Sequence, residues 1–441
     1  MVSKLWSTLL AAFVSLAVVD AAPKTPHISA PAFSHHFPKT PYHPRPPYGS
    51  GHSKVCTVIP KGSNKDDAPS ILAAAQKCNN GGKVYLPAGH NYTIASPLDL
   101  TFLKKVDLEF AGRITFTDDT DYWQNNSFYM TYQNATTFWL IGGESVNVYG
   151  GGTLDGNGQA WYDLYASNPL ILRPVLLVIY GARGGSVKDL NLVNSPQWFN
   201  FIANSSDFVY DGLNIHGAST SNNVAKNTDG WDIYRSDSIT VTNSIIYNGD
   251  DCVSFKPNST NIYVSNLYCN GSHGISVGSL GQYPEEFDIV ENVYSYNISM
   301  NYASDGARVK VWPGDPSALS TDLQGGGGAG YVKNVTFDTF YVNQVDYAIE
   351  LTQCYGQSNA TLCVEAPSKM NLTDISFKNI QGTTDGVRKN VITTIVCSLE
   401  SICSNISASN INVTSPAKYG TPKNICTRVD TSELDYTCSS S

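Results

Sequence analysis

Short runs of alternating apolar and polar residues, separated by turn residues, make up most of the chain. From Ile239 onward one pattern recurs, with apolar residues at its first and third positions and Asn at its fifth. It occurs in Ile239–Asn243, Ile262–Asn266, Ile375–Asn379 and Ile406–Asn410, in shortened form in Val332–Asn334, and in a looser copy that ends at Asn292. Asn243 and Asn266 are 23 residues apart, and Asn266 and Asn292 are 26 residues apart. A period in the low twenties indicates a fold built from repeated coils.

The repeat predicts a parallel β-helix, in which each repeat forms one coil and the coils stack about 4.8 Å apart. Asn at a repeated register predicts a hydrogen-bonded ladder inside the turns. The step of 42 residues from Asn292 to Asn334 fits two coils, or one coil with a long loop. A β-sandwich or a propeller also explains the strands, but a propeller blade needs about 40 residues or more. We therefore predict an all-β chain that forms a single-stranded parallel β-helix over residues 55–441.

The clearest helical pattern lies near the start of this region, in residues 66–78. Asp67 is suited to cap the helix, Pro69 suits its first turn, and the Asn-Asn-Gly-Gly of residues 79–82 ends it. Its apolar side predicts a short N-terminal capping helix that covers the open end of the stack, where strand edges need protection.

The first 54 residues have a different composition. Residues 1–21 are typical of a signal peptide, with Lys4 in the charged region, an apolar region from Leu5 to Val19, and small residues at the cleavage site. A buried N-terminal helix is the alternative. Residues 22–54 are rich in Pro and His and predict a flexible lead segment, with a His-rich metal-binding tract as the alternative. No later run is long enough to cross a membrane. We therefore expect a secreted, extracellular protein without a membrane partner.

The overall charge restricts the class of partner. Charged residues make up only 15% of the chain, and its net charge is −9. Proteins that bind nucleic acids are usually basic, so we expect no nucleic-acid partner. A polyanionic partner of another kind requires a local basic pocket that acts against the overall field.

Ten Cys residues in an exported chain predict disulfides. Nearest-neighbour pairing gives Cys56–Cys78, Cys252–Cys269, Cys354–Cys363, Cys397–Cys403 and Cys426–Cys438, although connectivity does not follow from sequence alone. Twelve Asn-x-Ser/Thr sequons predict a glycosylated secretory product. They are Asn91, Asn125, Asn134, Asn204, Asn258, Asn270, Asn297, Asn334, Asn359, Asn371, Asn405 and Asn412.

Three carboxylates, one histidine and two fixed cations lie between residues 227 and 310. They stand in Asn227-Thr228-Asp229-Gly230, Gly249-Asp250-Asp251-Cys252, Gly271-Ser272-His273-Gly274 and Arg308-Val309-Lys310. Asp250 follows Asn243 by seven residues, as His273 follows Asn266, so stacking of the two Asn residues places Asp250 and His273 on adjacent coils in one register. Arg308 and Lys310 are two residues apart on a strand and share a face. We expect all of these groups on one wall of the helix.

Carboxylates held close together on adjacent coils raise the pKa of at least one of them, which leaves one group as an acid and another as a base. Glycoside hydrolysis requires that division of roles. The simpler interpretation is that the Asn-x-Asp-Gly and Gly-Asp-Asp sequences are turns. A calcium site formed by Asp229, Asp250 and Asp251 is another alternative, which the nearby cations of Arg308 and Lys310 oppose. These two cations predict a substrate that carries carboxylates.

With these motifs in this order, the sequence resembles the fungal polygalacturonases of glycoside hydrolase family 28, from about Cys56 to the C-terminus. Residues 156–158 with Trp161, and residues 194–198, add to the resemblance. The sequence around Cys252 and that of residues 276–283 are most similar to the exopolygalacturonase branch of the family. The resemblance implies a right-handed, pectin-lyase-like parallel β-helix and inverting hydrolysis of α-1,4-galacturonosyl bonds. Inversion contrasts with the separation of about 5 Å that adjacent coils give two carboxylates, which is typical of retaining enzymes.

The resemblance also implies roles for single residues. Asp250 is the expected proton donor, Asp229 and Asp251 activate the water, and His273 supports the acid. The expected substrate-binding residues are Arg308, Lys310, Tyr347 and Asn227. We therefore expect a monomeric exopolygalacturonase that acts on pectic polysaccharide without a metal or organic cofactor. An endo-acting polygalacturonase and a hydrolase of xylogalacturonan or other branched pectin are the alternatives on the same fold, and a glycan-binding β-helix without activity is the alternative from another class.

Overall fold

The computed structural model describes residues 54–314, 325–357 and 360–439, which all belong to one compact unit of residues 51–441. The predicted signal peptide, the predicted lead segment except for Lys54, and the sequon at Asn359 lie outside the described residues. In the described part of the chain, no helix is both long and apolar enough to cross a membrane.

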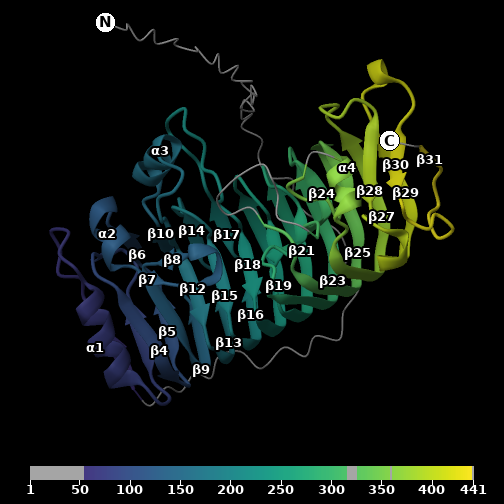
Figure 1. Ribbon diagram of the computed structural model, residues 1–441. Helices are drawn as coiled ribbons and strands as arrows, with labels where there is room; N and C mark the ends of the chain where they lie inside the picture. Colours follow the sequence, from purple (N-terminus) through teal and green to yellow (C-terminus); the bar gives the residue numbers. More distant parts are fainter. Residues whose placement is uncertain (1–53, 315–324, 358–359, 440–441) are drawn as a thin grey trace, which may run out of the picture. The chain divides into compact units, whose positions relative to one another are not determined.

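Twenty-eight strands of the described residues join in one sheet that coils around a common core (Figure 1). Its pairings are parallel and form three ladders of stacked strands, which is the predicted parallel β-helix. The first ladder contains β1 (Val55–Thr57), β2 (Lys83–Leu86), β5 (Asp107–Phe110), β9 (Trp139–Tyr149), β13 (Arg183–Lys188), β16 (Ser206–Asp211), β19 (Ser236–Tyr247), β21 (Ser259–Asn270), β23 (Phe287–Asn301), β25 (Ala329–Val345), β27 (Lys369–Thr384) and β29 (Cys403–Thr414).

The second ladder begins with separate short strands and continues through the C-terminal halves of β19 and the long strands after it. Its short strands are β3 (Asn91–Ile94), β6 (Arg113–Phe116), β10 (Thr153–Asp155), β14 (Asn191–Val193) and β17 (Asn214–His216). The third ladder, here called the site ladder, contains β4 (Leu98–Lys104), the start of β9, β12 (Leu177–Tyr180), β15 (Asn200–Ala203), β18 (Trp231–Tyr234), β20 (Val253–Phe255), β22 (Ile275–Leu280), β24 (Asp305–Val311), β26 (Tyr347–Thr352), β28 (Val391–Val396), β30 (Lys423–Thr427) and β31 (Cys438–Ser439).

The repeated Asn residues form two ladders rather than the single ladder that the sequence predicts. Asn266 donates from Nδ2 to Asn243 at 3.0 Å, and Asn297 donates to Asn266 at 2.9 Å. Asn292 instead donates to Asn261 at 3.0 Å, so it belongs to a second row of turns. The prediction that Asn292 follows Asn266 was therefore wrong by five residues, because both corners of the coil carry Asn. The step from Asn243 to Asn266, which fixes the register of the site, is confirmed.

Both rows of Asn occupy backbone positions with positive φ, at which Asn is several-fold enriched because its short polar side chain tolerates that region. Asn243, Asn266, Asn297, Asn379 and Asn410 have φ between 53° and 57°. The second row contains Asn261, Asn292, Asn334 and Asn405. Asn334 lies one coil after Asn292, so the step of 42 residues is one coil with a long loop.

Inward residues of successive coils stack into continuous apolar columns. Val293, Val335, Ile375 and Ile406 follow one another in register and are all buried. The rings of Phe337 and Phe377 lie parallel with their centroids 5.3 Å apart. Because like side chains stack on like, the core is continuous along the helix and needs no second layer.

The predicted capping helix is present as α1 (Ala68–Cys78), which packs against β1, β2 and β4 at the N-terminal end of the stack (Figure 1). It begins two residues later than predicted. Asp67 stands at the N-cap but makes no side-chain cap hydrogen bond. Its carboxylate instead accepts from the backbone N–H groups of Lys61 at 2.8 Å and Thr93 at 3.0 Å, and so joins the helix entry to β3.

Three further α-helices of the described residues lie in the loops, where the sequence predicted only turns. They are α2 (Thr120–Asn126), α3 (Gln159–Ser167) and α4 (Ala360–Glu365), and a small second sheet joins β7 (Phe128–Tyr129), β8 (Thr136–Thr137) and β11 (Pro174–Val175). Helices of so few residues are too short to show a clear helical period in the sequence. The five predicted disulfides are all confirmed, and the described residues contain no free Cys.

The Asn ladder gives a direct test of how the coils are held in register. Asn266→Ala removes two hydrogen bonds worth about 1 kcal/mol each and puts a less suitable residue at positive φ for about 1–2 kcal/mol more. Asn266→Gly keeps the backbone conformation and loses only the hydrogen bonds. Chemical denaturation should therefore give a larger loss of unfolding free energy for Ala than for Gly. Equal losses would contradict the role of the left-handed turn.

Candidate active site

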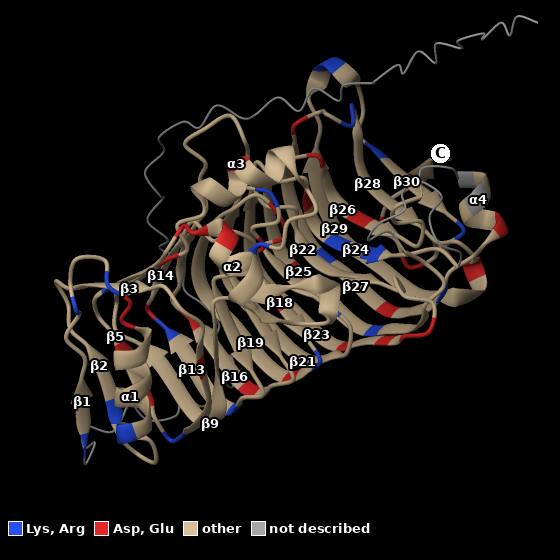
Figure 2. Cartoon of the chain, turned by 60° about the vertical axis from the view of Figure 1, so that its left-hand side comes forward, with Lys and Arg blue, Asp and Glu red and all other residues tan. Residues whose placement is uncertain are grey.

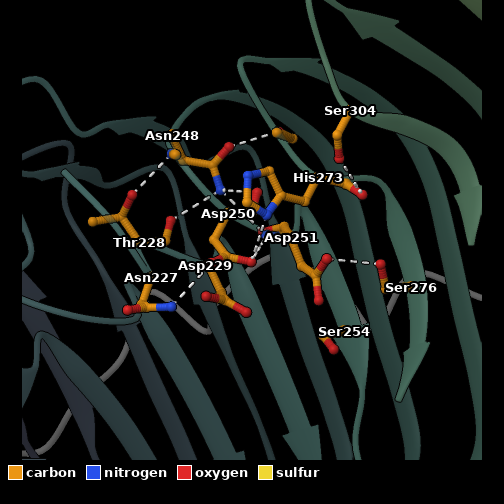
Figure 3. A network of polar contacts seen from close by, with 12 residues as sticks. Asn227, Thr228, Asp229, Asn248, Asp250, Asp251, Ser254, His273, Ser276 and Ser304 are labelled. Atoms are coloured by element: carbon orange, nitrogen blue, oxygen red, sulfur yellow. Dashed lines mark hydrogen bonds and ion pairs between the residues drawn. The ribbon is translucent and has the colours of Figure 1, made fainter. Parts of the chain in front are cut away.

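The site ladder brings together the groups that the sequence predicted on one wall. Asp229 precedes β18, Asp250 and Asp251 precede β20, and His273 precedes β22. Figure 3 shows these side chains at the ends of adjacent strands, pointing toward one another. One carboxylate oxygen from each of the three aspartates lies within 4.8 Å of the others. Arg308 and Lys310 lie on β24, and Figure 2 shows both basic and acidic positions along the ribbon of β24 and β26.

Asp250 and His273 form the predicted pair on adjacent coils. His273 Nδ1 lies 3.1 Å from Asp250 Oδ1, and the His273 backbone N–H donates to the Asp250 carbonyl at 2.9 Å. Burial opposes ionisation of Asp250, but the charge and hydrogen bond of His273, together with Lys310, hold the pKa of Asp250 well below its usual range. Burial likewise lowers the pKa of His273, but Asp250 outweighs it and raises that pKa above its ordinary value. The pair is therefore ionised at acidic pH.

Asp251 lies deeper and faces a cation. Its Oδ2 is 2.6 Å from Lys310 Nζ, and its Oδ1 accepts from the Ser276 hydroxyl at 2.8 Å. Burial raises the pKa of Asp251, but the charges of Lys310, Lys256 and Arg308 together leave the pKa below its ordinary value. Asp251 is therefore held as a carboxylate with a fixed orientation.

Asp229 has the opposite character. Burial, followed by the charges of Asp232 and Asp250, raises the pKa of Asp229 well above its usual range. Lys256 Nζ is 4.0 Å from the Asp229 carboxylate and 3.1 Å from that of Asp232. Burial raises the pKa of Asp232 to about 6 in spite of Lys256. In the substrate-free site the proton of the aspartate cluster therefore resides on Asp229, whereas Asp250 and Asp251 are ionised.

Arg308 stands at the edge of the cluster. Its Nε lies 2.7 Å from Glu350 and 3.5 Å from Asp305, and both acids belong to the same ladder. Burial raises the pKa of Asp305 to about 7, against the charge of Arg308. Tyr347 lies on β26, one coil beyond Asp305 in register, and the Arg388 guanidinium lies 5.1 Å from its ring centroid. Tyr347 thus lies beside Asp305 and Arg388, away from the three aspartates of the cluster.

Three residues that the sequence analysis did not single out fix the geometry. Arg173 donates from Nη2 to Asn227 Oδ1 at 2.8 Å, and Asn227 in turn donates from Nδ2 to Asp250 at 3.1 Å. Arg173 therefore sets the orientation of the Asn227 amide. It lies in a loop 54 residues earlier in the chain, so no local motif marks it.

Asn248 and Lys256 are the other two. Asn248 Nδ2 donates to the carbonyl oxygens of Thr228, Asp250 and Asp251, and its Oδ1 accepts from Ser272 at 2.6 Å (Figure 3). Asn248 therefore connects three successive coils through the backbone beside the catalytic aspartates. Its position directly before Gly249 was a usable signal in the sequence. Lys256, in contrast, is a buried lysine that composition and spacing do not distinguish from a surface lysine.

The three aspartates have the donor atoms of a divalent-cation site, which the sequence analysis weighed as an alternative. Two ammonium groups already face them, because Lys310 is 2.6 Å from Asp251 and Lys256 is 4.0 Å from Asp229. These fixed charges oppose a cation at the same place, so the donor set does not fit a resident calcium ion.

The Lys256–Asp232 pair predicts a pH-dependent stability. A carboxyl whose pKa is raised in the folded state stabilises the fold below its unfolded pKa and loses that contribution as the pH rises through the folded value. Lys256→Met raises the pKa of Asp232 beyond about 6. Thermal unfolding should show the variant near wild type at about pH 4, and less stable at about pH 8 by about 1.4 kcal/mol per unit of added pKa. Lys256→Met with Asp232→Asn should lose this pH dependence, and a deficit of equal size at both pH values would contradict the pairing.

Comparisons with known proteins identify the family of the chain. The model for "Glycosyl hydrolases family 28" matches residues 78–437. A "Probable exopolygalacturonase X" of Aspergillus fumigatus is 61% identical over 401 residues, which cover 91% of this chain and 92% of that protein. "Exopolygalacturonase X-1" of Emericella nidulans is 60% identical over 403 residues, again covering 91% and 92%. The crystal structure of an endo-xylogalacturonan hydrolase from Aspergillus tubingensis matches with a TM-score of 0.79 and 34% identity over 88% of this chain and 99% of that one. The chain therefore belongs to the glycosyl hydrolases of family 28.

Proposed function

We propose that the protein is a secreted exopolygalacturonase that hydrolyses the terminal α-1,4-galacturonosyl bond of polygalacturonate and releases galacturonic acid. The observation that carries this proposal is the aspartate cluster with Asp250 paired to His273, next to the cations Arg308 and Lys310. The exopolygalacturonases that are about 60% identical over nine tenths of the chain support the substrate and the exo mode.

In the proposed reaction, water attacks C1 of the terminal sugar while the bond from C1 to the leaving O4 breaks. Asp250 gives a proton to O4, and the carboxylate of Asp251 takes a proton from the water, with Asp229 beside it. His273 restores the proton of Asp250, since its Nδ1 is 3.1 Å from the Asp250 carboxylate.

The substrate itself supplies the condition under which Asp250 becomes an acid. In the free site Lys310 is among the charges that depress the pKa of Asp250. A galacturonate carboxylate bound to Arg308 and Lys310 offsets this positive charge, so binding raises the pKa of Asp250. The His273 imidazolium, whose Nδ1 lies 3.1 Å from the Asp250 carboxylate, can then pass its proton to Asp250. Substrate charge and catalytic protonation are thus coupled.

Digestion of polygalacturonate tests the proposed function. Early release of monomer with little loss of viscosity supports exo action, whereas oligomers with rapid loss of viscosity indicate endo action. Proton NMR of the first product identifies its anomer and so distinguishes inversion from retention. Xylogalacturonan should be included as a substrate, because the neighbour from Aspergillus tubingensis is a xylogalacturonan hydrolase. Faster turnover of xylogalacturonan than of polygalacturonate would favour the alternative function, hydrolysis of xylogalacturonan.

Secretion, glycosylation and a monomeric state belong to the same proposal. Eight described sequons are exposed, namely Asn91, Asn125, Asn134, Asn204, Asn334, Asn371, Asn405 and Asn412. Asn258, Asn270 and Asn297 are half-buried. The exposed Asn residues are therefore the better glycan acceptors. Mass spectrometry of the secreted protein before and after removal of glycans identifies the sequons that carry a glycan.

Asp250→Asn tests the assignment of the acid. An amide keeps the shape and the contact with Asn227 but has no proton to give, so kcat should fall by about 10²–10⁴. The release of galacturonate, measured by chromatography, gives the rate, and circular dichroism checks the fold. A folded variant with substantial residual turnover would show that another group protonates the leaving oxygen.

Arg308→Gln tests recognition of the substrate carboxylate. Loss of a hydrogen bond to a charged group should lower kcat/KM on polygalacturonate about 10- to 100-fold, mainly through KM. The loss should shrink on methyl-esterified pectin, which has no charge at that position. Arg183→Gln changes an exposed arginine that bonds only to Ser206 among the described contacts, and it serves as the control. An equal loss on both substrates would show that Arg308 acts only through Asp305 and Glu350.

A further inference from the structure

The outward face of the site ladder changes from apolar to polar along its length. One outward row places Val178, Phe201, Asp232, Ser254, Ser276 and Arg308 in register on successive strands. The coils that precede the catalytic aspartates therefore present apolar side chains, and the coils that follow present the polar groups of the site. An apolar outer face of this kind needs cover from water.

One segment of the chain covers that apolar part. Residues 128–137, which contain β7, the short helix η1 (Tyr132–Asn134) and β8, are here called the strap. Within the strap, Tyr132 is buried and its ring stacks on that of Tyr234 with centroids 4.1 Å apart. Tyr132 also packs in one cluster with Val178 and Phe201. This small apolar core fixes the strap on the outside of the β-helix.

The tip of the strap reaches across the groove. Gln133 Nε2 donates to Gln282 Oε1 at 3.2 Å, which joins residues 149 apart in the sequence. Gln282 follows β22, two strands beyond the β18 residue Tyr234 on which the strap rests. Gln133 has φ of 48°, a conformation that residues other than Gly, Asn and Asp adopt infrequently, whereas the φ of 52° at Asn134 is one that Asn tolerates. The contact of Gln133 with Gln282 therefore helps to hold the tip in a conformation that Gln does not favour.

A pocket of about 500 Å³ lies beside this clasp. Its lining includes Gln133, Gln282, Trp198, Arg173 and Asn227. Asn227 also donates to Asp250 at 3.1 Å, so one residue of the pocket lining contacts a catalytic aspartate. Its volume lies within the range of roughly 300–1,000 Å³ that is typical of small-molecule sites. A pocket of this size suits the end of a sugar chain better than the middle of a long polymer.

We propose that the strap is the specificity-determining wall of the groove, with Tyr132 as its anchor and the Gln133–Gln282 bond as its clasp. It ends the groove beside Asp250, so a pectic chain enters end first. The terminal unit occupies the pocket, and the rest of the chain extends over Arg308 and Lys310. This inference rests on the proposed function and deepens it, because it assigns the exo mode to named residues.

Opening the wall should convert exo into endo action. In a shortened strap, Gly-Gly replaces residues 130–134 and keeps the β7–β8 pair. This variant should produce oligomers from polygalacturonate, and its loss of viscosity per new reducing end should exceed that of wild type. Gln133→Ala and Gln282→Ala each remove the clasp bond and keep the rest of the strap, which should raise the open fraction about fivefold. Both should release some oligomers, and the double variant should release no more than either one because the two side chains share one bond.

The controls separate this inference from the function on which it rests. Gln344→Ala makes the same change at an exposed glutamine on β25 and should release only monomer. Asn134→Gln removes the sequon at the tip and keeps the Gln133–Gln282 bond. Release of oligomers by this variant would show that a glycan on Asn134 closes the groove, and would refute the role of the Gln133–Gln282 bond. If the shortened-strap variant folds and still releases only monomer, the proposed role of the strap is refuted. If that variant does not fold, release of only monomer by both clasp variants refutes it. A wild-type protein that releases no galacturonate would refute the proposed function itself.

Discussion

Parallel stacking at a fixed register is the constraint on which the rest of this structure depends. Each coil is joined to the next by backbone pairing, and left-handed turns at two corners, with Asn ladders in the later coils, repeat the bend at the same place. A residue therefore lies above whatever stands at the same register one coil earlier. His273 lies next to Asp250 for this reason, although the two are 23 residues apart in the sequence. The fold converts sequence period into proximity, and a catalytic cluster requires only the right side chains at one register.

The same register creates an electrostatic problem, because it places several carboxylates on neighbouring rungs. The chain resolves it with cations from other rungs of the same ladder. Lys310 fixes Asp251 as an anion, and Lys256 lies between Asp229 and Asp232. The balance leaves one carboxyl protonated and its neighbours ionised within a few ångströms. A substrate carboxylate at Arg308 and Lys310 disturbs that balance directly, so the charge by which the substrate is bound also affects the proton that the reaction needs.

The fold could be predicted from the sequence because the period of the repeat gives the length of one coil. The aspartates, His273 and the two cations could also be predicted to lie together, since they stand in short motifs at equivalent positions of successive coils. The sequence pattern placed Asn292 in the wrong row, because two corners use the same residue and only pairing tells them apart. It missed Arg173, whose contact with Asn227 joins a loop to a strand end, and it missed the burial of Lys256. Such features depend on how loops fold over the stack, and no repeat governs them.

The strap shows how a requirement of stability can set specificity. The early coils of the site ladder carry Val178 and Phe201 on their outer face, and the fold must cover them. An endo-acting groove needs that same surface open and polar so that a chain can pass through. A chain with apolar residues at these positions therefore requires a cover such as Tyr132, and that cover removes the path for a polymer on one side of Asp250. Exo action then follows from side-chain polarity on two strands, without any change in the catalytic groups.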